Sequence, residues 1–189
     1  MQKFIVSTDS TADLYADYVR EHDVRLAPLT FTIEKGGAMT EYLDAFTDYS
    51  QYVDFFQQLR EKAMPKTSML NYESHYNHFK KMAEEGAKDV LHFTISTGLA
   101  STINVARQAA ADVKKEYPEF NLKAVDSLAA TIGQGELVYE AVRLRDAARL
   151  SARLTKRCRR SLCIFNTSSR RTICSISNAA AGSRPRRRS

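Results

Sequence analysis

The sequence predicts an α/β fold with a mainly parallel sheet and helices on both faces. Two observations carry this prediction. Short apolar runs rich in β-branched and aromatic residues alternate with longer segments in which apolar residues recur at helical spacing. Strands that alternate with helices favour right-handed crossovers, and these place the strands parallel in one sheet.

The beginning of the chain is expected to form a strand followed by a helix. Residues 3–7 form a short apolar run that ends at a polar stretch, as is typical of a buried strand. Residues 12–21 place Leu14, Tyr18 and Val19 on one helical face. The fold therefore starts with a strand that leads into a helix.

The next segment is expected to contain one strand, one turn and one helix. Residues 24–33 are strand-like around Pro28, and residues 34–37 (EKGG) have the composition of a turn. Residues 50–62 are amphipathic and predict a helix. Its expected inward-facing residues are Val53, Phe56 and Leu59.

A proline separates this helix from a second amphipathic segment. We expect Pro65 to break the regular structure immediately before Thr67 and Ser68. Residues 72–85 then show helical periodicity, and Gly86 supplies the positive φ that commonly ends a helix.

The remaining elements continue the alternation of strands and helices. Residues 89–95 form a β-branched and aromatic run suited to a central strand. A helix is expected at residues 99–117 and a further strand at residues 122–125. A last helix follows the GQG segment at residues 133–135 and is expected to end near residue 146.

Polar residues follow three of the expected strands. The segments are Asp9-Ser10-Thr11, Ser96-Thr97-Gly98 and Asp126-Ser127. In parallel α/β sheets, ligands bind beyond the carboxyl ends of the strands, where hydroxyl groups and helix N-terminal N–H groups can bind an anion. Helix capping uses the same residue types and is the alternative for each segment alone. Together with Thr67 and Ser68, the three segments predict an anion pocket.

Charge is distributed unevenly along the chain. The net charge is +6, yet all 22 acidic residues lie before residue 149, and 12 of the 28 Lys and Arg residues lie after residue 148. A basic tail can bind nucleic acid non-specifically, whereas the acidic body gives no such indication. The three cysteines also lie in the tail, at spacings that match no common zinc site. We therefore divide the chain into residues 1–148 and residues 149–189.

Five sequence elements resemble those of one known family, the DegV family. In chain order they are residues 5–14 (IVSTDSTADL), 26–29 (LAPL), 64–68 (MPKTS), 95–102 (ISTGLAST), and the paired segments VDS at 125–127 and GQG at 133–135. The resemblance implies that residues 1–148 are the N-terminal α/β domain of a DegV protein, with the second domain of the family missing.

The resemblance also implies a carrier and not an enzyme. Family members hold one long-chain fatty acid between two α/β domains and present it to a separate fatty acid kinase. The implied carboxylate contacts are Thr67 and position 100, where this chain has Ala100 in place of a hydroxyl residue. The neighbouring candidates are Ser68, Ser96 and Ser101, and the wider pocket is expected to include Asp9, Ser10, Asp126 and Ser127. The fatty acid is the expected ligand, and no cofactor or metal is expected.

The tail from residue 149 is predicted to be out of frame or disordered. When the codons permitted by residues 172–184 (TICSISNAAAGSR) are regrouped by one base, they can encode DDLFYLKRGGRVS. That peptide resembles the D-D-L-x-x-L-K-R-G-G-R-[IV]-S element of the DegV family, so we expect the frame to change around residues 147–156. The alternative is a basic arm that binds nucleic acid, although no nucleic-acid partner is expected.

An enzyme is the alternative function for residues 1–148. It would act on a small phosphorylated or carboxylated substrate, with Asp9 as nucleophile or metal ligand. A strand followed by Asp is similar to phosphoryl-transfer sites in general. Here Thr11 occupies the position two residues later, where a second Asp would be expected.

The sequence also bears on the cellular location. No apolar run approaches the ~20 residues that a transmembrane helix needs. The first residues enter a strand-like pattern directly, without the features of a signal peptide. A cytoplasmic location is therefore expected.

Overall fold

The structure, a computed structural model, describes residues 4–150, with side chains as far as residue 147. The strands are β1 (Ile5–Asp9), β2 (Val24–Ala27), β3 (Thr30–Lys35), β4 (Ala38–Leu43), β5 (Met64–Ser68), β6 (Asp89–Thr94) and β7 (Asn121–Asp126). The helices are the 3-10 helix η1 (Ser10–Ala12), α1 (Ala16–Glu21), α2 (Tyr49–Arg60), α3 (Tyr72–Glu84), α4 (Thr102–Glu116) and α5 (Ile132–Leu150).

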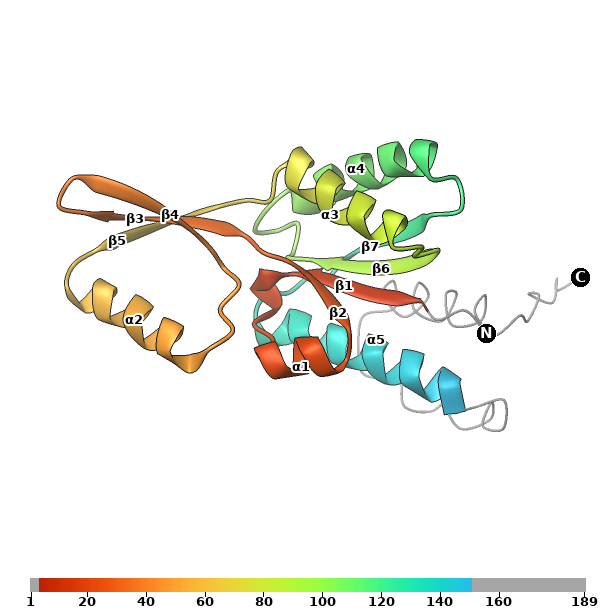
Figure 1. Cartoon of the computed structure of the whole chain (residues 1–189), viewed down its shortest axis with the longest axis horizontal. Coiled ribbons are helices and arrows are strands. Elements are labelled where there is room, and N and C mark those ends of the chain that lie inside the picture. The colour runs from red at the N-terminus through yellow and green to blue at the C-terminus, as the bar shows by residue number, and fades with distance from the viewer. Residues whose placement is uncertain (1–3, 151–189) are drawn as a thin grey trace, which may run out of the picture.

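The larger of two sheets is parallel throughout. Its strand order is β2-β1-β6-β7, so β6 lies in the interior, as its apolar sequence predicts. Helices α1 and α5 cover one face, and α3 and α4 cover the other (Figure 1). The predicted α/β fold, with a mainly parallel sheet and helices on both faces, is confirmed.

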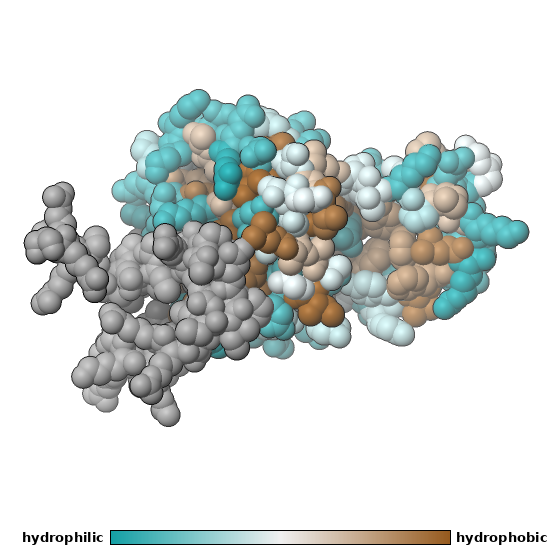
Figure 2. Space-filling view, turned by 180° about the vertical axis from the view of Figure 1, so that it is seen from behind, coloured by the Kyte–Doolittle hydropathy of each residue, from teal (hydrophilic) through white to brown (hydrophobic). Residues whose placement is uncertain are grey.

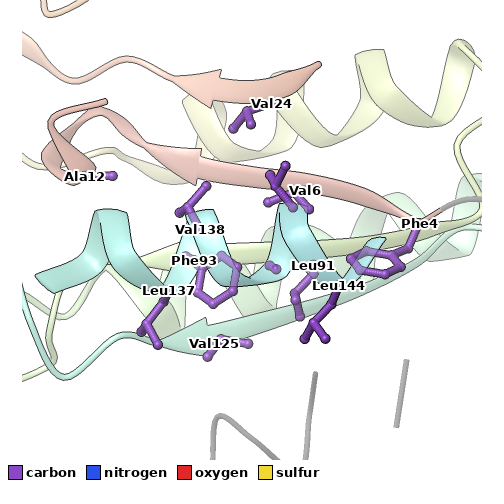
Figure 3. Packing of buried hydrophobic residues seen from close by; sticks show 12 residues of the cluster. Phe4, Val6, Ala12, Val24, Leu91, Phe93, Val125, Leu137, Val138 and Leu144 are labelled. Carbon is purple, nitrogen blue, oxygen red and sulfur yellow. The ribbon is translucent and has the colours of Figure 1, made fainter. Parts of the chain in front are cut away.

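The two faces of this sheet bury alternate residues of the same strands, because successive strand side chains point to opposite faces. On β1, Val6 packs on the α5 side, while Ile5 packs against the cluster formed with α3 and α4. On β6, Leu91 and Phe93 face α5 and Val90 faces the opposite side. Figure 3 shows the α5 side as one continuous apolar cluster. This packing holds the carboxyl ends of β1, β6 and β7 side by side.

A smaller lobe projects from the main sheet (Figure 1). It is a three-stranded antiparallel sheet of order β4-β3-β5, and α2 lies beside it. The buried core of the lobe is small and consists of Phe31, Ile33 and Ala63, with Phe46 and Phe55 packed against it. The predicted EKGG turn joins β3 to β4, but the sequence did not predict β4 itself.

The single strand predicted over residues 24–33 is wrong, because two strands occupy this segment. β2 ends at Ala27 in the parallel sheet, and β3 begins at Thr30 in the smaller lobe. Pro28 lies between them, and proline has no N–H with which to continue a ladder. The segment is therefore one of the connections between the two sheets.

The break predicted at Pro65 is also wrong. Pro65 lies inside β5, directly opposite Ile33 of β3. β5 is an edge strand of its sheet, and proline is tolerated at such an edge because its missing N–H can face away from the neighbouring strand. Thr67 and Ser68 are therefore strand residues.

Two predicted helices begin later than expected. In the segment 12–21, η1 ends at Ala12 and α1 begins only at Ala16. Asp13 between them has a left-handed backbone with φ 48°, which a continuous helix cannot accommodate. The helix predicted from residue 99 begins at Thr102, because the preceding residues form a turn.

The inward orientation predicted for α2 is wrong for two of its three residues. Val53 is 45% exposed and Phe56 is 52% exposed. Phe55 is the α2 residue that packs into the core of the smaller lobe. A three-stranded sheet offers too little surface to cover the whole apolar face of α2, so part of that face stays open to solvent.

The predictions for residues 151–189 lie outside the described residues. At the boundary, helix α5 runs past the predicted end near residue 146 to Leu150. Within residues 4–150, no helix is both long enough and apolar enough to cross a membrane.

Candidate functional site

A cavity of about 770 Å³ lies between the main sheet and the smaller lobe. Small-molecule sites typically have volumes of about 300–1,000 Å³. The lining residues are Asp9, Thr11, Asp13, Leu29, Thr30, Phe31, Asp44, Phe46, Tyr52, Phe55, Phe56, Pro65, Thr67, Ser68, Met69, Leu70, Ile95, Leu99, Ala100, Thr102, Ala130 and Thr131. The cavity thus brings the ends of β1 and β6 together with β3, β5 and α2.

Aromatic rings form the wall of the cavity on the smaller lobe. The ring centroid of Phe31 lies 5.3 Å from that of Phe55 and 5.9 Å from that of Phe46, both with edge-to-face geometry. Phe46 also meets Tyr52 at 4.9 Å, and Phe56 follows Phe55 at 5.4 Å. Such edge-to-face contacts stabilise ring clusters beyond the burial of their area. This wall offers an apolar surface to a hydrocarbon.

Hydroxyl groups are distributed around the rest of the lining. They belong to Thr11, Thr30, Thr67, Ser68, Thr102 and Thr131. None of the described lining residues is Lys, Arg or His. An anion bound here is therefore met by hydroxyl and N–H donors and not by a cationic side chain of the described chain.

Asp9 lies at the carboxyl end of β1 and is 1% exposed. Its Oδ1 lies 2.5 Å from Thr11 Oγ1 and accepts a hydrogen bond from Gln134 Nε2 at 2.7 Å. Its Oδ2 accepts the backbone N–H of Ile95 at 3.1 Å. Burial raises the pKa of Asp9, although the hydrogen bonds act in the opposite direction. Asp9 thus joins β1, the end of β6 and α5 in one network.

Two further acids line the cavity near Tyr52. Burial and the nearby charge of Asp44 raise the pKa of Asp13. Burial, Asp44 and Asp13 in turn raise the pKa of the Tyr52 hydroxyl. Despite these acids, no group of three or more His, Cys, Asp or Glu side chains within the described residues could hold a metal ion.

The predicted site residues fall into two groups. The first group lines the cavity and contains Asp9, Thr67, Ser68 and Ala100. Thr67 lies on β5 opposite Phe31, and Ala100 lies just before α4. Residues from three separate parts of the sequence are thus brought to one cavity.

The second group does not line the cavity and instead holds the surrounding loops. Ser10 Oγ accepts the backbone N–H of Leu29 at 3.0 Å, which fixes the connection between β2 and β3. Ser96 Oγ accepts the backbone N–H of Gly98 at 3.1 Å inside the turn after β6. Both hydroxyls therefore serve local structure.

The residues after β7 also have local partners. The Thr97 hydroxyl donates to Asp126 Oδ2 at 2.6 Å, which links the loops after β6 and β7. The Ser127 hydroxyl donates to the carbonyl oxygen of Ala129 at 2.8 Å. Ser101 is the exposed N-cap residue of α4, and its side chain makes no capping hydrogen bond. Helix capping, the alternative role for these polar residues, is therefore not the role of the Ser101 side chain.

Some residues of the site could not be recognised from the sequence. The contact between Gln134 and Asp9 spans 125 residues, so no local pattern reveals it. Asp44 lies in no motif that marks it as a cavity residue, whereas Thr11 belongs to the Asp9-Ser10-Thr11 segment that the sequence already placed at a strand end. One signal was available, because Phe55 and Phe56 follow Tyr52 on an amphipathic helix and could have indicated an aromatic wall.

Comparison with known proteins connects the site to one family. The sequence pattern of the DegV family, described as uncharacterised proteins, matches residues 3–157. A DegV domain-containing protein of Clostridium perfringens is 33% identical over 145 residues, which are 77% of this chain and 48% of that protein. The chain therefore spans about half the length of this relative.

Solved structures show the same architecture. A stearic acid-binding protein from Eubacterium ventriosum has a TM-score of 0.62 and 29% identity, over 76% of this chain and 48% of that chain. A DegV family protein from Thermus thermophilus, described for its fatty acid binding, has a TM-score of 0.60 and 25% identity, over 94% of this chain and 54% of that chain. Since the family match covers most of its residues, this chain belongs to the DegV family.

Proposed function

We propose that this chain binds one long-chain fatty acid in the cavity between the main sheet and the smaller lobe. The observation that carries the proposal is the composition of the cavity. It combines an aromatic wall with hydroxyl groups, and its described lining has no cationic side chain. The reported fatty acid binding of the E. ventriosum and T. thermophilus proteins supports this ligand class.

The fatty acid carboxylate is assigned to the side of the cavity near Thr67. A hydroxyl that donates to a carboxylate makes a charge-assisted hydrogen bond, so no cation is required. Ser68 adjoins Thr67 on β5, and Ala100 also lines the cavity. The DegV resemblance points to the same two positions, 67 and 100, for the head group.

The acyl chain is assigned to the aromatic wall. Burial of apolar area contributes about 25 cal/mol per Å², so a long acyl chain binds in proportion to the area that is covered. Phe56 and Tyr52 remain partly open to solvent, and Figure 2 shows hydrophobic surface on both lobes. We propose that a second domain, as the family resemblance implies, covers this side in full-length members.

The proposed role is that of a carrier which presents the fatty acid to a separate kinase. The carboxyl group of Asp9 is occupied by Thr11, Gln134 and the N–H of Ile95. A side chain held in this way is a structural part of the cavity and is poorly placed to attack a substrate. We therefore propose no chemical step for the chain itself.

The experiment uses the complete 189-residue chain. Protein purified from cells is extracted with organic solvent and analysed by mass spectrometry, and delipidated protein is titrated with palmitate and oleate by calorimetry. Phe55→Ala should weaken binding because it removes part of the aromatic wall. Tyr49→Ala is the matched control, since Tyr49 is an exposed aromatic residue of the same helix outside the cavity lining.

Two results would count against the carrier proposal. One is a protein that carries no fatty acid after purification and ignores added palmitate and oleate. The other is a phosphatase activity that disappears in Asp9→Asn, since this would favour the enzyme alternative.

A further inference from the structure

Asp9, Thr11 and Gln134 form a closed ring of three polar contacts beside the cavity. Thr11 Oγ1 lies 2.5 Å from Asp9 Oδ1 and 2.9 Å from Gln134 Oε1. Gln134 Nε2 lies 2.7 Å from the same Oδ1 atom of Asp9. All three separations are within hydrogen-bond distance, so each contact requires one hydrogen.

An ionised Asp9 leaves this ring one hydrogen short. The Thr11 hydroxyl supplies one hydrogen and can direct it at Asp9 or at Gln134, but not at both. The Gln134 amide supplies one more, because its second N–H points to Thr8 Oγ1 at 2.9 Å. If the amide nitrogen and oxygen of Gln134 are exchanged, Thr11 and Gln134 still supply one hydrogen each to the ring. With Asp9 ionised, two hydrogens are available for three contacts. One pair of oxygen atoms is then left in contact with no hydrogen between them.

We infer that Asp9 is a neutral carboxylic acid that supplies the third hydrogen of this ring. The Asp9 hydroxyl donates to Thr11 Oγ1, Thr11 donates to Gln134 Oε1, and Gln134 Nε2 donates to the Asp9 Oδ1 atom. Every contact then contains one hydrogen. The ring presents no negative charge to the cavity.

The surroundings of Asp9 are consistent with this assignment. The side chain is 1% exposed, and burial is the largest influence on its pKa, which it raises. Hydrogen bonds from the side chains of Thr11 and Gln134, and from the backbone N–H groups of Ile95 and Thr11, act against this by favouring the charged form. The titratable groups that face the same cavity are Asp13, Asp44 and Tyr52, and none of them can supply a positive charge.

A neutral Asp9 favours the binding of an anionic ligand. This step rests on the proposed fatty acid binding. Two carboxylates that share one site repel each other, so one of them takes up a proton. A protonated Asp9 allows an anionic head group to enter a cavity that already contains Asp13 and Asp44. Asp9 is thus a residue that determines specificity, and ligand affinity falls when its proton is lost.

The protonation state is measured directly on the complete, ligand-free chain. Carbon-13 NMR of labelled aspartate side chains follows each carboxyl group with pH, and the Asp9 signal is identified as the one missing in Asp9→Asn. The inference expects Asp9 to remain protonated at neutral pH. An Asp9 signal that titrates near the ordinary value of about 3.9 would overturn it. This measurement needs no fatty acid.

A binding experiment tests the link to the ligand. Palmitate affinity of the parent chain should fall as pH rises through the Asp9 transition observed by NMR. In Asp9→Asn this dependence should be lost, because the amide is neutral at every pH. Asp13→Asn is the matched control, since it removes another cavity acid without touching the ring, and it should keep the dependence.

The outcomes separate the two proposals. A protonated Asp9 in a chain that binds no fatty acid supports the ring and contradicts the proposed function. Tight palmitate binding with the same pH dependence in the parent and in Asp9→Asn contradicts the role of Asp9 in ligand choice.

Discussion

Gly135 of α5 lies directly against the carbonyl oxygen of Ala12, and a Cβ atom placed on Gly135 would be 2.8 Å from that oxygen. The oxygen belongs to the backbone of η1, so it cannot rotate away as a flexible side chain could. The missing side chain of Gly135 therefore allows α5 to approach η1. This approach places Gln134 beside Asp9 and Thr11.

Gly135→Ala should lower the free energy of unfolding by about 1–3 kcal/mol, the typical cost of overpacking a well-packed site. Urea denaturation followed by circular dichroism measures the change. Gly98→Ala is the control, because a Cβ at Gly98 would meet only Ser96 Oγ at 3.4 Å. Equal stability of Gly135→Ala and the parent would show that η1 and α5 move apart without cost.

Acid should destabilise the fold through a buried histidine cluster. His75 and His78 on α3 lie close to His92 on β6, with ring centroids 5.5 Å and 6.1 Å from that of His92. Ser7 Oγ lies 2.9 Å from both His78 Nε2 and His92 Nδ1. Burial lowers the pKa of His75 and of His78 to about 4, and it lowers the pKa of His92 as well.

The sign of the effect follows from proton binding. The unfolded chain binds protons at about pH 6.5, whereas folded His75 and His78 stay neutral down to about pH 4. Their contribution to stability is therefore complete above about pH 6.5 and is lost as the pH falls towards 4. The loss is on the order of 3 kcal/mol for a fully buried histidine such as His75.

Urea denaturation at a series of pH values measures this loss. In His75→Leu, the free energy of unfolding should fall less steeply between about pH 6.5 and 4, because the substitution removes one of the groups that must stay neutral in the folded chain. His22→Gln is the control, since the His22 side chain is 37% exposed and lies outside the cluster. A parent chain whose stability is constant over this range would contradict the prediction.

The parallel sheet was predictable from sequence, but the smaller lobe was not. β6 is almost wholly buried because helices cover both of its faces, and its β-branched and aromatic residues make the strand recognisable from the sequence alone. Every residue of β4 is exposed, so its sequence contains no alternation of apolar and polar residues. Pro65 was misleading because a proline can occupy a strand at the edge of a sheet. Whether β5 is an edge strand depends on the tertiary structure and cannot be read from the local sequence.

Part of the candidate site was predictable: Asp9 from its place at the end of β1, and Thr67, Ser68 and Ala100 from the family resemblance. Asp9 was found because it ends β1, whereas Gln134 reaches it from a helix 125 residues away. The hydroxyls of Ser10 and Ser96 have the same sequence context as a ligand site but bind neighbouring backbone N–H groups. Local patterns therefore locate the strand ends without telling which side chains face the cavity.

The basic tail gives a prediction about the gene. We expect the DNA that encodes residues 172–184 to read DDLFYLKRGGRVS after a shift of one base, with the change of frame near the codons of residues 147–156. Sequencing the genomic DNA and its transcript tests this. Codons that do not encode this peptide in the shifted frame would contradict it and would favour the basic arm as a native segment.

Thr67→Val should weaken palmitate binding roughly tenfold or more, since a hydrogen bond to a charged group is worth about 1.5–3 kcal/mol. Isothermal titration calorimetry measures the affinity. Thr40→Val is the matched control. Thr40 is an exposed residue of β4 in the same sheet, it pairs with Ile33 of β3, and it does not line the cavity. Unchanged affinity in Thr67→Val would place the carboxylate elsewhere.

Ala100→Ser should strengthen palmitate binding, because it adds a hydroxyl donor to the cavity lining at the second position proposed for the head group. The gain is specific to the charged head group, since a hydrogen bond to an ionised acceptor is roughly twice as strong as one to a neutral acceptor. Calorimetry with palmitate and with a neutral long-chain alcohol of the same length separates the two contributions. The alcohol should gain much less than palmitate, because it buries the same hydrocarbon but carries no charge. An equal gain for both ligands would assign the effect to packing at position 100 and not to head-group recognition.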